Sequence, residues 1–161
     1  MKKYRDTGAQ GALLDEYEKA NDELIDLIKT ISHKELITIV DTKTKDDDCR
    51  SIQTILSHII RAGYTYVTAI RKHEGDELDY MPNVIFNNSD EYIQGLKFMF
   101  NANVKMFKDH PNLQLEEMDN FKKIKARWGQ SYDPEQLLEH AIVHILRHRR
   151  QIERFLVKLR D

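Results

Sequence analysis

Three histidines near the C-terminus, His140, His144 and His148, are spaced four residues apart within residues 139–152. If this stretch is helical, side chains at positions i and i+4 share one face, with Cβ atoms about 6 Å apart. Imidazole nitrogens bind divalent metal ions at roughly 2.0–2.1 Å, so two histidines at this spacing can reach one ion. A third ligand must come from another helix, and His58 is the best candidate. The residues therefore indicate a three-histidine metal site.

The positions of these histidines on helical wheels predict which of them point inward. With His144 set at zero, the apolar residues of its helix form a stripe between about 20° and 120°. His148 lies inside this stripe and His144 at its edge, whereas His140 lies near −40°, outside it. His58 lies at the margin of the apolar stripe of its own helix. Burying imidazoles against aliphatic side chains is costly unless their nitrogens find partners, which a shared metal ion would provide.

Four segments with apolar residues at helical spacing are predicted to position these histidines. The first covers about residues 10–31, the second begins at Asp48 or Ser51 and ends near residue 72, the third covers about 91–108, and the fourth begins at Pro134 and continues almost to the end. Residues 32–35 have the form of a capping box for a short helix, although the β-branched residues that follow make an extended segment an equal alternative. Residues 113–132 are predicted to be irregular.

Length and composition agree with a helical domain. The chain has 161 residues, 40% hydrophobic and 32% charged, with 3 prolines, 6 glycines and no internal repeat. These values predict a single domain over residues 1–161 that is soluble and rich in helix. With no convincing alternating strands, four amphipathic helices predict an all-α four-helix bundle, in which facing helices build sites from inward side chains.

The charge, the lack of long apolar runs and the single cysteine argue against a nucleic-acid binder, a membrane-spanning protein and a protein with internal disulfides. The formal charge of −2 argues against a dedicated nucleic-acid binder, although the last helix ends in a basic cluster. No apolar run is long enough to span a membrane and no signal peptide is recognisable. The single Cys49 cannot form an internal disulfide. A cytoplasmic location with a reducing environment is therefore expected.

Two motifs resemble those of the DinB-like (DinB/YfiT) superfamily. They read S-I-Q-T-I-L-S-H-I-I over residues 51–60 and E-H-A-I-V-H-I-L-R-H-R-R-Q-I over residues 139–152. Members of that superfamily carry a serine-led helix with a histidine seven residues on, and a closing helix with H-x-x-x-H-R-G-Q. The matching positions here are Ser51, His58, His144, His148, Arg149 and Gln151. Arg150 departs from the usual glycine, but the wheel directs it to solvent, which leaves the ligands intact.

The resemblance implies both a topology and a type of site. The topology is an up-down-down-up bundle with a long crossover between the second and third helices. The site is a divalent metal held by His58, His144 and His148, nickel or zinc foremost, although three imidazoles also suit iron and manganese. Members often form homodimers and include thiol-dependent transferases and isomerases. We therefore expect a metal-dependent hydrolase or small-thiol transferase whose small-molecule substrate could be a low-molecular-weight thiol.

Residues around the expected site have alternative interpretations. His140 is either solvated helix surface, or a proton shuttle or supporting partner of the ligands. Gln151 lies on the ligand side of its helix and could orient a ligand or substrate. Tyr64 is placed at the mouth of the pocket and Tyr66 in the core. Cys49 could have a thiol pKa lowered by the helix dipole, although a lone cysteine without a paired base is more often incidental.

Two broader alternatives also stay open. The basic residues between Lys122 and Arg127 are either a solvated loop or a grip on an anionic substrate. The three histidines could instead be polar groups at the edge of the bundle, hydrogen-bonded to backbone or carboxylates. In that case the protein would be a non-catalytic bundle in which metal or apolar packing supports dimerisation or a stress-response interaction. The substrate, the metal, the general base and the oligomeric state are not determined by the sequence.

Overall fold

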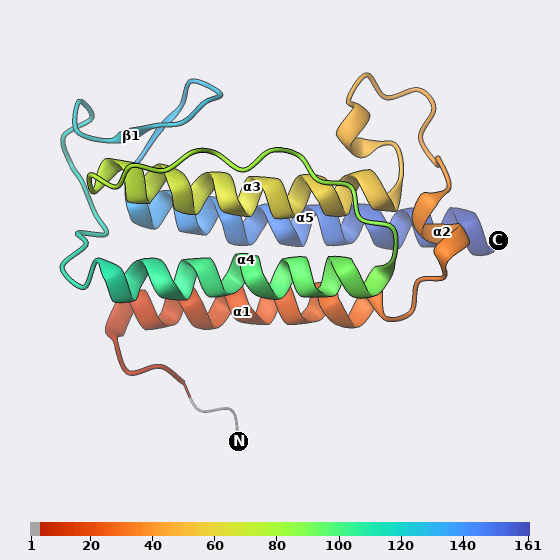
Figure 1. The fold of residues 1–161 in the computed structure, drawn as a ribbon, viewed down its shortest axis with the longest axis horizontal. Coiled ribbons are helices and arrows are strands. Elements are labelled where there is room, and N and C mark those ends of the chain that lie inside the picture. Colours follow the sequence, from red (N-terminus) through yellow and green to blue (C-terminus); the bar gives the residue numbers. More distant parts are fainter. Residues whose placement is uncertain (1–3) are drawn as a thin grey trace.

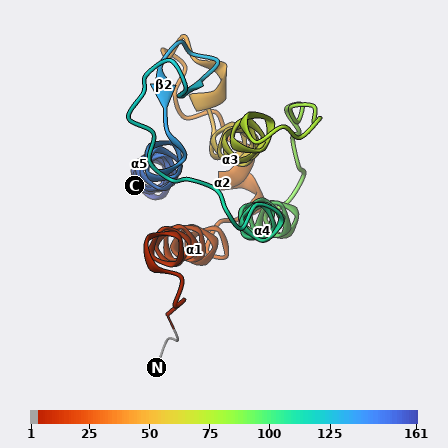
Figure 2. The ribbon, with the colours of Figure 1, turned by 90° about the vertical axis from the view of Figure 1, so that its left-hand side faces the viewer.

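Four long helices lie side by side in the structure, a computed structural model that describes residues 4–161 (Figure 1). They are α1 (Gly8–Ile28), α3 (Ile52–His73), α4 (Ser89–Asp109) and α5 (Pro134–Arg160). Both α1 and α3 pack against α4 and α5, so the helices form a ring in the order α1, α4, α3, α5 (Figure 2). The predicted all-α class is confirmed.

The directions of the helices can be followed by colour in Figure 1. The first and last helices, α1 and α5, run from left to right, whereas α3 and α4 both run from right to left. Two consecutive long helices can run in the same direction only if the chain returns between them. Residues 74–88 make this return along the length of α3. As a result α3 and α5, which carry the histidines, are neighbours in the ring.

Local side-chain chemistry explains where the helices begin. The Ser51 hydroxyl accepts a hydrogen bond from the Thr54 backbone N–H, so Ser51 rather than Asp48 caps α3. Asp133 caps α5 in a capping box with Gln136, and Pro134 takes the first helical turn, as predicted. These caps satisfy backbone N–H groups that have no partner inside the helix. They therefore fix the start of the two helices on which the site is built.

Shorter elements connect the long helices. The capping box of residues 32–35 begins α2 (His33–Ile37), and the chain then becomes extended, because Ile39 forms an isolated antiparallel bridge with Ser51. A 3₁₀ helix, η1 (Asp47–Cys49), precedes α3. Residues 113–132 were expected to be irregular, but they contain an antiparallel hairpin of β1 (Ile124–Lys125) and β2 (Ser131–Tyr132). Strands of two residues are too short to show the alternation by which a sequence indicates a strand.

The core lies between the four long helices. Its largest fully buried side chains come from α1, α3 and α4, with one from α2: Tyr17, Leu24, Ile28, Leu36, Ile52, Ile55, Leu56, Ile59, Ile70, Tyr92, Leu96 and Met99. The hairpin and the segment before α3 both lie on the α3–α5 side of this core (Figures 1 and 2). Within residues 4–161, no helix combines the length and the apolar character needed to cross a membrane. The described fold therefore gives the histidines a rigid support of two adjacent helices.

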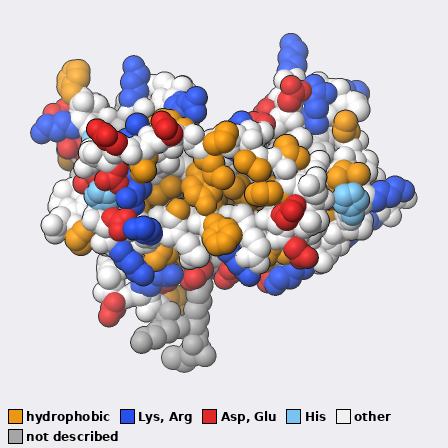
Figure 3. Space-filling model, in the orientation of Figure 1, with side chains coloured by type: hydrophobic (Ala, Val, Ile, Leu, Met, Phe, Trp, Pro, Cys, Tyr) orange, Lys and Arg blue, Asp and Glu red, His pale blue; other side chains and the backbone are white. Residues whose placement is uncertain are grey.

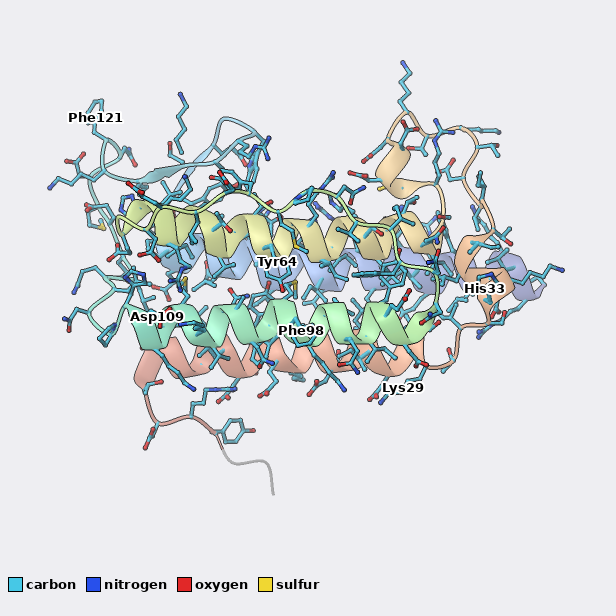
Figure 4. All side chains as sticks on the ribbon, in the orientation of Figure 1. Lys29, His33, Tyr64, Phe98, Asp109 and Phe121 are labelled. Atoms are coloured by element: carbon cyan, nitrogen blue, oxygen red, sulfur yellow. The ribbon has the colours of Figure 1, made fainter. Side chains whose placement is uncertain are left out.

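Hydrophobic side chains also gather on the surface, over α3, α4 and the returning segment (Figure 3). Among them Phe98 of α4 projects from the bundle and is 63% exposed (Figure 4). Leu78 and Ile85 of the returning segment are also exposed. This apolar surface lies on the α3–α4 side and contributes no residue to the histidine site.

Candidate metal centre

The structure brings His58, His144 and His148 together. His58 is on α3 and the other two are one helical turn apart on α5. The Nε2 atoms of His58 and His144 lie 3.0 Å apart, and one nitrogen from each of the three rings lies within 4.8 Å of the others. His144 and His148 are each only 5% exposed, and His58 is half-buried. The site is thus a cluster of three imidazoles at the edge of the core.

The protonation of two of these rings follows from their partners. A carboxylate accepts hydrogen bonds but cannot donate, and Asp48 Oδ2 at 3.1 Å lies closer to His58 Nδ1 than the Arg61 guanidinium at 3.4 Å, so the proton of neutral His58 is placed on Nδ1. The Gln151 Oε1 atom is likewise only an acceptor, and it lies 3.0 Å from His148 Nδ1. In both histidines the lone pair is therefore on Nε2. Carbonyl and carboxylate partners of this kind orient metal-binding histidines.

Two observations test whether a metal ion fits this cluster. The buried Nε2 of His148 has no hydrogen-bond partner within residues 4–161, and leaving a buried acceptor unpaired is costly. Two nitrogens bound to one ion at about 2.0–2.1 Å in tetrahedral geometry lie roughly 3.3 Å apart, close to the separation of the His58 and His144 nitrogens. A set of three imidazoles is also a common donor set for divalent metals. The residues therefore fit a bound ion.

Burial keeps the three imidazoles neutral. Desolvation is the main cause that lowers the pKa of His144, and the neighbouring His148 and His58 rings add to it. Desolvation also lowers the pKa of His148 and of His58, although the Gln151 and Asp48 contacts act in the opposite direction. Metals bind the neutral form of histidine, so the environment favours the form that a ligand needs.

A cavity of about 570 Å³ opens beside the three histidines. A closed structural metal site would be surrounded by protein, whereas a catalytic site keeps a position that small molecules can reach. The cavity contains charged, polar and aromatic side chains in addition to the ligand candidates. Its lining consists of Asp46, Cys49, His58, Tyr66, Trp128, Gln130, His140, His144, Arg147, His148 and Gln151.

Aromatic rings form one wall of this cavity. Trp128, in the turn of the hairpin, stacks on His140 with ring centroids 5.4 Å apart and planes at 22°. Tyr66 meets His140 edge-on at 5.4 Å and His144 edge-on at 5.8 Å. Tyr132 of β2 also contacts His140, at 5.6 Å. His140, expected on solvated surface or as a supporting partner, is therefore half-buried among aromatic rings; its role as a proton shuttle stays a prediction.

Of the other residues predicted near the site, some line the cavity or contact a histidine and one does not. Gln151 contacts His148, as the wheel indicated. Tyr64 does not line the cavity; it lies on the part of α3 that faces α4 (Figure 4). Tyr66 is buried in the core, as predicted, and it also lines the cavity. Cys49 lines the cavity too, but burial raises the pKa of its thiol, contrary to the suggested lowering by the helix dipole.

Two site residues, Asp48 and Trp128, were not recognised in the sequence. Asp48 was assigned as a helix cap, but its carboxylate binds His58 and the Arg61 guanidinium. Trp128 lies in a segment that showed no periodicity, so no signal directed it to the site.

The basic segment around Trp128 is not simply solvated, because Lys123 contacts both Asp133 and Gln136 at the start of α5. These contacts hold the hairpin against α5.

A comparison with protein families matches residues 4–159 to the DinB family. The chain belongs to the DinB family. The match covers the four long helices and all three histidines of the cluster, in agreement with the resemblance of the two motifs. A comparison with curated proteins found no match. Membership and the histidine cluster are together compatible with a DinB protein that binds metal.

Proposed function

We propose that this DinB protein is a divalent-metal-dependent enzyme that acts on a small molecule, as a hydrolase or a transferase of small thiols. The observation that carries the proposal is the convergence of three neutral imidazoles from α3 and α5 at the wall of an open cavity. His58, His144 and His148 would hold the ion, with nickel or zinc as the first candidates and iron or manganese as others. The directions of the helices in Figure 1 support the up-down-down-up topology that this family implies.

The residues of the chain have separable tasks in this proposal. Asp48 and Gln151 hold the rings of His58 and His148 with their Nε2 lone pairs directed into the cluster. Tyr66 and the hairpin cover part of the cavity and limit the access of water. When bound, a divalent ion supplies Lewis-acid chemistry, because it lowers the pKa of a coordinated water or thiol. Hydrolysis and thiol transfer both need this property.

The first experiment measures metal in protein purified without an affinity tag. Wild-type protein is expected to contain one equivalent of a divalent metal, and His144→Ala is expected to lose it. His140→Gln is the matched control, because His140 lies one turn before His144 on the same helix and also lines the cavity but is not part of the cluster. Metal that is stoichiometric in wild type and undiminished in His144→Ala would remove His144 from the site and with it the proposed function.

A second experiment separates an enzyme from a non-catalytic metal-binding bundle. Cobalt(II) can replace zinc and has visible absorption bands that depend on its ligands. If the cavity gives access to the ion, thiocyanate or 2-mercaptoethanol should change this spectrum. A spectrum that neither probe changes would support the alternative, in which metal serves stability or dimerisation. Homodimerisation itself stays a prediction that size-exclusion chromatography with light scattering can check.

A further inference from the structure

Arg147 is the residue of the cavity whose charge has no partner. It lies on α5 between two candidate metal ligands, is exposed, and lines the same cavity as they do. Within residues 4–161 its guanidinium makes no hydrogen bond and no ion pair. Its charge still reaches the site: it adds to the burial that lowers the pKa of His140 and His144, and it partly opposes the burial that raises the pKa of Tyr66. The mouth of the cavity thus contains an unneutralised cation next to neutral imidazoles.

Among the described residues, Asp46 is the one carboxylate that lines the cavity, and it does not neutralise this cation. Asp46 accepts a hydrogen bond from the Asp48 backbone N–H at 3.0 Å and one from the Cys49 thiol at 3.5 Å. It forms no ion pair with Arg147 in the described part of the chain. Asp48, the other nearby carboxylate, pairs with Arg61 and contacts His58. Arg147 is therefore available to a ligand from outside the protein.

A second hollow, of about 540 Å³, adjoins the first and shares Arg147 and Gln151 with it. Arg150 and Arg154 line this second hollow, and neither has an ion pair within residues 4–161. Three guanidinium groups along one strip of α5 give this side of the cavity a positive potential, which attracts anions. Of these three arginines, Arg147 is the one that also lines the cavity beside the histidine cluster.

We propose that Arg147 binds the anionic group of the substrate, a small molecule with a carboxylate or phosphate on a planar body that lies against Trp128. The inference deepens the proposed function and rests on it, since the histidines are taken as the reacting end of the site. A guanidinium presents a planar fork of N–H donors that matches the oxygens of carboxylate and phosphate. The Trp128 ring lines the same cavity as Arg147 and is 44% exposed, so although one face stacks on His140 it still offers apolar surface to a ligand.

Trp128 also provides the measurement, because it is the single tryptophan of the chain. Benzoate and phenyl phosphate are titrated against the full-length protein while its fluorescence is recorded, and benzamide serves as the uncharged probe of the same shape. In wild type at least one anion is expected to bind about tenfold more tightly than benzamide, the effect of one charge-assisted contact. The tighter of the two anions identifies the chemical class of the substrate.

The preference for the anion over benzamide is expected to disappear in Arg147→Gln. It is expected to remain in Arg150→Gln, because Arg150 lines only the second hollow. Absence of saturable binding by either anion in wild type, or a preference that survives Arg147→Gln, would overturn the assignment.

The titrations are repeated after treatment with a chelator and its removal. A preference that is lost on chelation but not in Arg147→Gln would show that the anion binds metal instead. A preference that needs Arg147 but not metal would support the anion site even if the metal proposal fails.

Discussion

At the scale of single residues, Asp48 decides how His58 can serve as a ligand. Its carboxylate fixes the His58 proton on Nδ1 and leaves Nε2 directed at His144. Asp48→Ala should therefore weaken metal binding by about 10–100-fold, the usual effect of removing a partner that orients a ligand. Competition with a chromophoric chelator measures the affinity.

Asp47→Ala is the control for this prediction. Asp47 is the neighbouring residue of η1 and is exposed, and its carboxylate pairs with Arg50 rather than with a histidine. Its removal should leave the metal affinity unchanged. If Asp48→Ala binds metal as tightly as wild type, His58 needs no orienting carboxylate, and the assigned role of Asp48 is wrong.

The ligand candidates could be predicted from the sequence because helical geometry fixes where side chains point. Once α3 and α5 are helices, spacing and apolar stripes direct His58, His144 and His148 toward one margin of the core. The same reasoning could not find Asp48 or Trp128, because both lie in segments that fold back on the bundle. Their contacts with His58 and His140 depend on the path of the chain in space, which local periodicity does not encode.

At the scale of elements, Glu35 connects α2 to the end of α5. Its Oε1 accepts a hydrogen bond from Arg160 at 2.6 Å, and its Oε2 accepts one from the Ser32 backbone N–H at 2.7 Å. The Arg160 guanidinium, followed by the contacts with Ser32, lowers the pKa of Glu35 from 4.5 to about 2. Because the pKa is lowered on folding, the carboxylate stabilises the protein fully above pH 4.5, and this contribution is lost as the pH falls toward 2.

Glu35→Gln keeps an oxygen for the Ser32 contacts but removes the charge. At pH 7 it should reduce the free energy of unfolding by about 0.5–1 kcal/mol, since Arg160 is half exposed and the pair is screened by solvent. The difference from wild type should shrink as the pH falls below 4.5, which urea unfolding at several pH values can follow. Glu16→Gln on α1, where the nearest Lys19 contact is 3.9 Å, should show no such trend. A constant difference across the pH range would refute the ionic contribution.

The boundaries of the elements were predictable wherever a cap precedes a strong apolar pattern. Asp133 with Pro134 begins α5 as the sequence predicts, and the capping box at Ser32 begins α2. The hairpin was missed because two-residue strands have no periodicity and are formed only where the chain packs against α5 through Lys123. Short elements of this kind owe their conformation to tertiary contacts rather than to their own residues.

At the scale of the whole molecule, the proposed ion would join α3 to α5, neighbours in the ring but separated in the sequence by the returning segment and α4. Binding to the native state alone stabilises a protein by about 2.7 kcal/mol when the free ligand is 100 times its dissociation constant. For a chain of 161 residues this corresponds to a rise in melting temperature of roughly 5–10 °C.

We expect this rise when zinc or nickel is added to chelator-treated wild-type protein, measured by circular dichroism. His144→Ala should show little or none of it, although the variant itself should fold, since the core between the helices stays intact. His140→Gln should respond as wild type does, because its ring lies in the aromatic wall and not in the cluster. An equal rise in wild type and His144→Ala would mean that the metal binds elsewhere. The α3–α5 junction would then be held by apolar packing alone.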